Sequence, residues 1–420
     1  MSKLLPQHLP ALDGLRGVAI LMVVLTHAGG GWQAAQSLTE NTLTWPATFD
    51  VPGWLAAIAG YGVHGVTLFF VVSAFTLTLS MASRRDLARY AVRRVARVGP
   101  GYWLAGICYT LAAGLAPRLC APDGIILSDL ALAAAFGSAW QGGASMAVVP
   151  GGWSVSCEVG FYIALPLVLW LIQGSIWRVV LLTLASFVMV QLASRYAGAH
   201  GGWHCVPQYI HPGVQAPVFL CGITAALIVQ RVRLPAVPGL AVGLLAFAAL
   251  VLPFSPVREW HLLPHLAFAA TVAAVVALSA QHPPRLLASA AMRRVGEVSY
   301  SMYLIHFALL APSLAAAEWL TGADDWRTLA LHVALTAACS FALGCVTYRW
   351  IEQPSIRWAG RQIQRPAPAA VAPGGDHASR VTQRLHRLRT RRTLAGSQAP
   401  EPDGVGMPRV VRAGAATWRR

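Results

Sequence analysis

The first hydrophobic segment of the chain contains an arginine and a histidine, Arg16 and His27, eleven positions apart. At 100° per residue this spacing is three turns plus roughly 20°, so a helix would project both side chains from one face, about 16 Å apart along its axis. Arginine binds anionic groups, and imidazole titrates near neutral pH. Ionisable side chains are costly inside a bilayer, which predicts a functional pair. The alternative is a snorkelling Arg16 and an interfacial His27.

The composition is that of an integral membrane protein. Of the 420 residues, 56% are hydrophobic and only 11% are charged, whereas about a quarter are charged in soluble proteins. A bilayer span needs roughly 20 mostly apolar residues, and the chain has room for many. We therefore predict an all-α, polytopic helical bundle of about ten transmembrane helices. The predicted spans lie near residues 12–29, 55–80, 99–116, 153–172, 176–194, 214–230, 237–253, 263–280, 298–317 and 328–348.

The basic residues are unevenly distributed along the chain, whose formal net charge is +16. Arginines gather in alternate connections between the predicted spans and acidic residues in the others, as the positive-inside rule requires. With a cytoplasmic N-terminus, an even number of spans also leaves the C-terminus in the cytoplasm. Basic chains can bind nucleic acid, but membrane topology explains this charge more simply, so we predict no nucleic-acid partner.

The chain is predicted to have two parts. Residues 1–358 would form a membrane-embedded domain, and residues 359–420, rich in Arg, Pro, Ala and Gly, a basic and disordered cytoplasmic tail. The seven cysteines show no CxxC spacing and the outer-loop histidines no metal-ligand spacing, so no metal site is predicted. Cys120 and Cys205 fall in predicted outer loops, where they either form a disulfide or remain two separate thiols.

Six sequence blocks follow one another through the predicted membrane domain. In chain order they are Leu12-Asp13-Gly14-Leu15-Arg16-Gly17 continuing to His27, Gly65-Val66-Thr67-Leu68-Phe69-Phe70-Val71-Val72-Ser73-Ala74-Phe75, Arg93-Arg94-Val95-Ala96-Arg97, Trp153-Ser154-Val155-Ser156-Cys157-Glu158, Ser299-Tyr300-Ser301-Met302-Tyr303-Leu304-Ile305-His306 and Tyr348-Arg349-Trp350-Ile351-Glu352-Gln353-Pro354. Together they resemble the acyltransferase 3 family over about residues 9–358. The second block departs from the family pattern, which usually has Asp at the position of Thr67 and Gly at that of Ala74.

This resemblance implies an integral membrane enzyme that acylates hydroxyl groups, mostly of surface glycans, in the bacterial inner (plasma) membrane. The implied donor is acyl-coenzyme A, most simply acetyl-coenzyme A, which arrives from the cytoplasm as a substrate rather than a resident cofactor. Arg94 and Arg97, one helical turn apart, would bind its phosphates together with Arg16. Positive-inside marking is the alternative explanation for Arg94 and Arg97. The implied acceptor is an O-antigen, exopolysaccharide or lipid-linked sugar.

The resemblance also implies roles for the remaining polar residues. His27 would act as general base on the acceptor hydroxyl or carry the acyl group itself. Glu158 would orient His27 or share its proton, or else would be a border residue facing water. Arg16 would assist at the reacting end as well as in donor binding. Ser73 and Tyr300 would line the substrate path or only bridge helices, and His306 would contact the substrate or have a structural role.

Two other classes of protein remain open at this point. A transporter or flippase for an anionic glycan intermediate could also use an arginine and a histidine within the membrane. The arginine-rich block around Arg94 and the block that ends at Glu158 favour the enzyme, because a transporter has no evident need for them. A non-catalytic scaffold is disfavoured by the costly polar residues in the spans.

Overall fold

The computed structural model describes residues 9–29, 52, 55, 58–59, 62–82, 86–117, 121, 123–141, 147–199, 210–236 and 263–364. Throughout these residues the regular elements are helices, and no β-strand occurs. The predicted span at 237–253 lies outside the described residues, as do Cys120 and Cys205.

Seven helical segments of the described chain are long and apolar enough to cross a membrane. They are α1 (Pro10–Ala28), the turn η1 (Gly62–His64) with α4 (Gly65–Ala82), α8 (Gly152–Ile172), α9 (Ile176–Ala199), α10 (Pro212–Val229), α14 (Ser299–Thr321) and α15 (Trp326–Thr347) with its continuation. The apolar helix α12 (Leu263–Gln281) coincides with the predicted span at 263–280. The prediction of an all-α, multi-pass membrane protein is therefore confirmed, whereas the count of ten spans stays a prediction.

Helix α5 (Leu87–Ala113) begins well before the span predicted from residue 99. Asp86 caps its first turn, because the carboxylate accepts a hydrogen bond from the backbone N–H of Arg89 at 3.0 Å. The helix consequently includes the arginine block at 93–97. Arg93 and Arg97 are four residues apart and share a helix face.

Shorter helices complete the described chain. These are α6 (Leu127–Ala134), α7 (Ser138–Gln141), α13 (Ala290–Glu297), the π-helical turn η4 (Tyr348–Glu352) and α16 (Gln353–Gln364). Helix α15 passes through η4 into α16 without a break, and a π-helical turn of this kind re-aims the side chains that follow it. Helix α16 continues past the domain boundary predicted at residue 358, and the tail from residue 365 lies outside the described residues.

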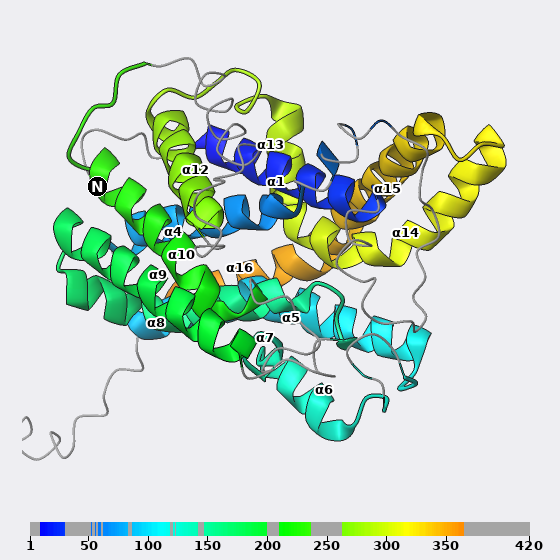
Figure 1. Ribbon diagram of the computed structural model, residues 1–420, viewed down its shortest axis with the longest axis horizontal. Helices are drawn as coiled ribbons and strands as arrows, with labels where there is room; N and C mark the ends of the chain where they lie inside the picture. The colour runs from blue at the N-terminus through cyan, green and yellow to red at the C-terminus, as the bar shows by residue number, and fades with distance from the viewer. Residues whose placement is uncertain are drawn as a thin grey trace, which may run out of the picture. The chain divides into compact units, whose positions relative to one another are not determined.

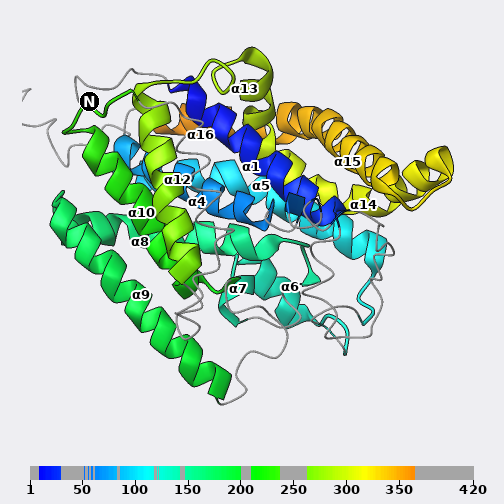
Figure 2. The same ribbon diagram turned by 45° about the horizontal axis from the view of Figure 1, so that its top comes forward.

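Helix α1 lies in the interior of the bundle. It packs against α13, α4, α14 and α15, while α4 also packs against α10 and α12 (Figures 1 and 2). Its core-facing residues Ala19, Ile20, Val23 and Val24 are fully buried. Figure 2 shows α9 at the margin of the bundle, next to α10 and α8. α1 thus has protein on several sides, as a helix carrying charged groups in a bilayer requires.

Large apolar side chains point outward from the marginal helices. On α8 and α9 the exposed fractions reach 76% for Ile163, 70% for Trp170 and 77% for Trp177. A soluble protein rarely exposes so many large apolar side chains side by side, whereas lipid tails cover such a surface at no hydrophobic cost. This distribution agrees with helices that face lipid.

Two glycines allow α1 and the segment around α13 to approach each other closely. A Cβ atom at Gly14 would lie 2.0 Å from the carbonyl oxygen of Leu287, and one at Gly296 would lie 1.7 Å from that of Asp13. Both distances are impossible for real atoms, so a side chain at either position would force the two elements apart. The contact fixes the helix turn that carries Asp13 and Arg16.

We predict that Gly14→Ala lowers the stability of the folded protein by about 1–3 kcal/mol through overpacking. The matched control is Gly360→Ala in α16, where a Cβ atom would meet nothing within 4 Å and alanine favours the helix. Thermal unfolding of the purified protein in detergent would measure both variants. Equal melting temperatures for Gly14→Ala and the unmodified protein would contradict the close approach.

Candidate active site

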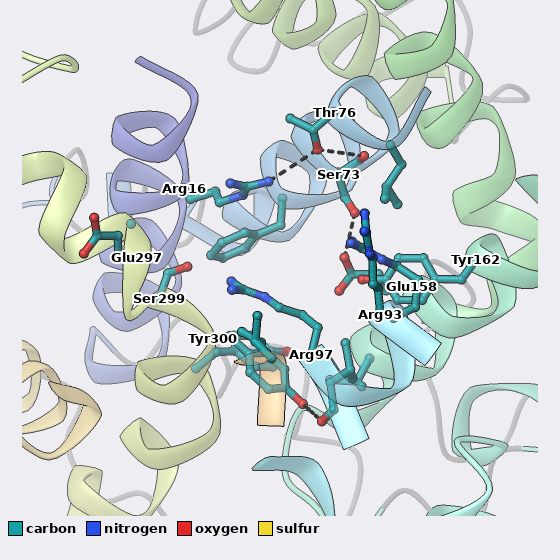
Figure 3. Close-up of a pocket in the computed structure, with 18 of the residues that line it drawn as sticks. Arg16, Ser73, Thr76, Arg93, Arg97, Glu158, Tyr162, Glu297, Ser299 and Tyr300 are labelled. Atoms are coloured by element: carbon teal, nitrogen blue, oxygen red, sulfur yellow. Dashed lines mark hydrogen bonds between the residues drawn. The ribbon is translucent and has the colours of Figure 1, made fainter. Parts of the chain in front are cut away.

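A polar cavity of about 680 Å³ lies between the helices that carry the arginine block and the first block. Its wall is formed by the start of α1, the length of α4, the first half of α5, the start of α8, the end of α13 and the start of α14, together with η4 and α16 (Figure 3). The charged residues of the described chain that line it are Asp13, Arg16, Arg93, Arg94, Arg97, Glu158 and Glu297. Arginines therefore outnumber carboxylates in the described wall.

Arg16 points into this cavity from α1 and is held by two helices (Figure 3). Its Nη1 atom lies 2.8 Å from Oδ1 of Asp13, one turn earlier on the same helix. Its Nη2 atom donates to the hydroxyl of Thr76 on α4 at 3.3 Å. An ion pair and a hydroxyl thus stabilise a guanidinium that would otherwise be costly to bury.

Glu158 and Ser73 join α8 to α4 in the cavity wall. The Ser73 hydroxyl donates to Oε1 of Glu158 at 2.7 Å, a short charge-assisted hydrogen bond (Figure 3). Both residues were predicted site residues, and the structure places them in contact with each other. Tyr300, a third predicted residue, lines the same cavity and donates from its hydroxyl to the Val98 carbonyl at 2.7 Å.

Arg94 and Arg97 line the cavity from α5. The guanidinium carbon of Arg94 is 5.9 Å from the ring centre of Tyr90 and 5.8 Å from that of Tyr162, which places it in cation–π contact with both rings. Its buried Nε atom has no hydrogen-bond partner in the described chain. Arg97 points toward the middle of the cavity, and no hydrogen bond or ion pair of its side chain occurs within the described residues (Figure 3). The guanidinium groups of both arginines therefore have N–H groups that could donate hydrogen bonds to an anion.

Two residues that complete this wall had no specific role in the sequence analysis. Arg93 lines the cavity and points toward Glu158 (Figure 3), and its spacing of four residues from Arg97 could have shown that both share a face. Thr76 holds Arg16, yet nothing in the sequence distinguishes it from other hydroxyls in the spans. At the edge of the cavity, Glu297 pairs with Arg294 at 3.0 Å and raises the pKa of that guanidinium.

Glu352 is a further buried carboxylate that the sequence blocks contain without a predicted role. It is the last residue of the π-helical turn η4 and is only 2% exposed. The hydroxyl of Ser301 on α14 donates to its Oε1 atom. The contact fastens α14 to the helix that continues from α15, next to the cavity residue Tyr300.

His27 and His306 form a pair of their own. Nε2 of His306 lies 3.1 Å from Nδ1 of His27, and the ring centres are 5.0 Å apart. Phe307 packs against both rings. Neither histidine is among the described residues that line the cavity. In the described chain Glu158 bonds Ser73 and makes no hydrogen bond to His27, so the ring that neighbours His27 is that of His306.

Tyr303 lies between the cavity and the histidine pair. It lines the cavity, and its ring centre is 5.6 Å from that of His306. Its hydroxyl donates to the Gly151 carbonyl at 2.9 Å and accepts from Ser154 at 2.8 Å. One aromatic side chain thus connects the predicted donor-binding residues to the predicted base.

Fold and site together define a multi-pass membrane protein with a polar, arginine-rich cavity and, beyond Tyr303, a part-buried histidine pair. The family model described as an acyltransferase domain matches residues 9–349, and the chain belongs to this acyltransferase 3 family. The chain is therefore a membrane acyltransferase.

Curated relatives agree with this assignment. The acyltransferase MdmB of Streptomyces mycarofaciens is 28% identical over 412 residues, which cover 90% of this chain and 98% of the relative. A putative O-acetyltransferase of Staphylococcus aureus (strain COL) is 22% identical over 389 residues, 83% of this chain and 57% of the relative. No solved structure matches the chain.

We predict that Ser73→Ala destabilises the protein by about 1–3 kcal/mol, because the Glu158 carboxylate then loses the hydrogen bond from the Ser73 hydroxyl. The control is Ser186→Ala on α9, whose hydroxyl bonds the Thr183 carbonyl of its own helix. Thermal unfolding in detergent would compare the two variants. The same melting temperature for both would show that the link between α4 and α8 contributes nothing.

Proposed function

We propose that this protein moves an acetyl or other short acyl group from acyl-coenzyme A to a hydroxyl of a cell-surface glycan. The acceptor would be an O-antigen, an exopolysaccharide or a lipid-linked sugar, and the enzyme would work in the bacterial inner membrane. The observation that carries this proposal is the cavity of about 680 Å³ lined by Arg16, Arg93, Arg94 and Arg97 among the described residues.

The donor follows from the charge and size of this cavity. Acyl-coenzyme A is a polyanion with a flexible arm, and arginines bind phosphate oxygens through several hydrogen bonds at once. The volume falls within the roughly 300–1,000 Å³ of small-molecule sites. The free donors of Arg94 and Arg97 support phosphate binding there. Arg16, already paired with Asp13, would bind a further phosphate or lie beside the reacting carbonyl.

The chemistry would take place where the arm passes Tyr303 toward His27. His27 would accept the proton of the acceptor hydroxyl while that oxygen attacks the thioester carbonyl carbon. The carbon–sulfur bond then breaks, and the leaving thiolate takes the proton back from His27. The products are the ester and free coenzyme A, with no net change in the enzyme. Glu158 would contribute to the cavity wall through Ser73 rather than contact His27.

Names of relatives support the transfer to oxygen, since one group is described as putative O-acetyltransferases. Family membership favours the enzyme over a transporter or flippase for an anionic glycan intermediate. Mass spectrometry of surface glycans from cells with and without the gene would identify the acceptor and the acyl group together. Identical glycans in the two strains would overturn the proposed acceptor class.

We predict that His27→Ala lowers the transfer rate by at least about 10²-fold, the usual contribution of a general base. The matched control, His282→Ala, changes an exposed histidine that bonds the Leu234 carbonyl, and should transfer at the normal rate. Transfer assays with acetyl-coenzyme A, at equal amounts of folded protein, measure both. Normal transfer by His27→Ala would exclude His27 as the base.

We predict that Arg97→Gln raises the KM for acyl-coenzyme A by about tenfold or more, because one charge-assisted contact is worth roughly 1.5–3 kcal/mol. Arg178→Gln is the control, because Arg178 is exposed on α9 and bonds Gln173 at 2.6 Å. Steady-state kinetics at varied acyl-coenzyme A concentrations would measure the donor KM of both variants. An unchanged KM for acyl-coenzyme A in Arg97→Gln would show that Arg97 does not bind the donor and would favour the positive-inside explanation of this residue.

A further inference from the structure

A second, smaller cavity adjoins the active-site cavity at the start of α5. It has a volume of about 330 Å³, and its described lining comes from the end of α4 and the start of α5 and includes Asp86, Arg89 and Tyr90. Arg93 and Arg94 line this smaller cavity and the larger, active-site cavity as well. The two cavities are therefore neighbours.

Arginines of α5 follow one another from the smaller cavity into the larger one. Arg89, Arg93 and Arg97 are spaced four residues apart, which places them on one helix face, about 6 Å from one position to the next along the axis. Of the two cavities, Arg89 lines the smaller, Arg93 both and Arg97 the larger. A ligand with phosphates at several points along its length could therefore contact arginines in both cavities.

Arg89 is held by the residue that caps its helix. The Asp86 carboxylate accepts from the backbone N–H of Arg89 at 3.0 Å through Oδ1, and its Oδ2 atom lies 2.8 Å from Nε of Arg89. Both carboxylate oxygens are engaged in these contacts, which offsets their repulsion of an incoming anion. Within the described residues no hydrogen bond of the Arg89 Nη groups occurs. The side chain is 57% exposed, so a soluble anion can reach it.

Tyr90 and Arg94 lie where the two cavities meet. Tyr90 lines the smaller cavity, and its hydroxyl donates at 3.2 Å to the carbonyl of Tyr162, a residue of the larger cavity. The Arg94 guanidinium is in cation–π contact with both rings. The smaller cavity thus offers an aromatic side chain beside cationic ones. Nucleic-acid bases stack on aromatic side chains, and phosphates bind arginines, so this lining suits a nucleotide.

From this arrangement we infer that the smaller cavity binds the nucleotide end of acyl-coenzyme A, with Arg89 contacting the 3′-phosphate of its adenosine. The inference rests on the proposed function, because it takes acyl-coenzyme A as the donor. A volume of about 330 Å³ is near the lower limit of small-molecule sites, which suits a nucleoside rather than the whole coenzyme. The diphosphate would lie at Arg93 and Arg94, and the flexible arm would continue through the larger cavity toward Tyr303.

The two cavities together are long enough for an extended donor. The α4 residues that line them run from Val66 to Met81, which is about 22 Å along a helix axis. A ligand with phosphates at one end and a thioester at the other fits a path of this length, because its two ends must reach different parts of the site.

Coenzyme A and 3′-dephospho-coenzyme A differ only in the phosphate assigned to Arg89. Isothermal titration calorimetry on the purified full-length protein, in nanodiscs of phosphatidylcholine, measures both Kd values without an acceptor. We expect the dephospho form to bind roughly fivefold more weakly, which corresponds to about 1 kcal/mol, the upper range for an exposed ion pair. Arg89→Gln should weaken coenzyme A binding by the same factor and leave the Kd of the dephospho form unchanged, so that the two ligands become equal.

Two further variants serve as controls. Arg89→Lys keeps the charge and should retain most of the difference between the two ligands, although lysine lacks the planar fork of arginine. Arg357→Gln changes an exposed arginine of α16 that bonds Gln353 and is not among the described residues lining either cavity. This variant should retain the full difference.

Equal Kd values for the two ligands in the unmodified protein would overturn the inference and would favour an anionic lipid headgroup as the partner of Arg89. A full difference between the ligands in Arg89→Gln would overturn it as well. No binding of either ligand would instead overturn the proposed donor, and the nucleotide site with it, which keeps the two failures distinct.

Discussion

A guanidinium that remains charged within a bundle of membrane helices is the constraint on which the rest of this site depends. Arg16 is tolerated because Asp13 lies one turn away at 2.8 Å and Thr76 of α4 supplies a hydroxyl. Both partners depend on the position of α1, which Gly14 and Gly296 fix by close contact with the neighbouring segment. Ser73, on the same helix as Thr76, continues the polar contacts to Glu158 on α8. Three helices are thus joined by the groups that stabilise one charge.

The arginines and the histidine pair occupy different parts of the site, and their charges explain this separation. Residues able to bind a polyanion gather on α1 and α5 around the cavity, whereas the histidine pair lies beyond Tyr303, between α1 and α14. An imidazole that has to accept a proton works poorly beside several arginines, because like charges disfavour its protonated form. The position of the proposed base His27 outside the arginine-lined wall avoids this conflict. A donor with a long flexible arm suits such a separation, since its phosphates and its thioester lie far apart.

Much of the fold and part of the site could be predicted from the sequence for physical reasons. The low charge content and the long apolar segments predicted a polytopic helical membrane protein, and the six blocks predicted the acyltransferase 3 family; both predictions are confirmed. The gathering of Arg16, Arg94, Arg97 and Glu158 at one cavity agrees with the blocks in which they occur. Tertiary partners were harder to predict, because a sequence does not show which face of one helix meets another. Glu158 consequently looked like the partner of His27, whereas its carboxylate bonds Ser73.

The choice of partner for His27 has a consequence for the barrier of the proposed reaction. A carboxylate beside an imidazole stabilises the imidazolium strongly, but as a buried charge it also needs compensation of its own throughout the cycle. The Tyr303 carbonyl satisfies Nδ1 of His306, so a neutral His306 ring adds no buried charge. Its Nε2 atom lies 3.1 Å from Nδ1 of His27, where it would stabilise an imidazolium less than a carboxylate would. A base of this kind gives its proton back readily, which suits a step that ends with protonation of a departing thiolate.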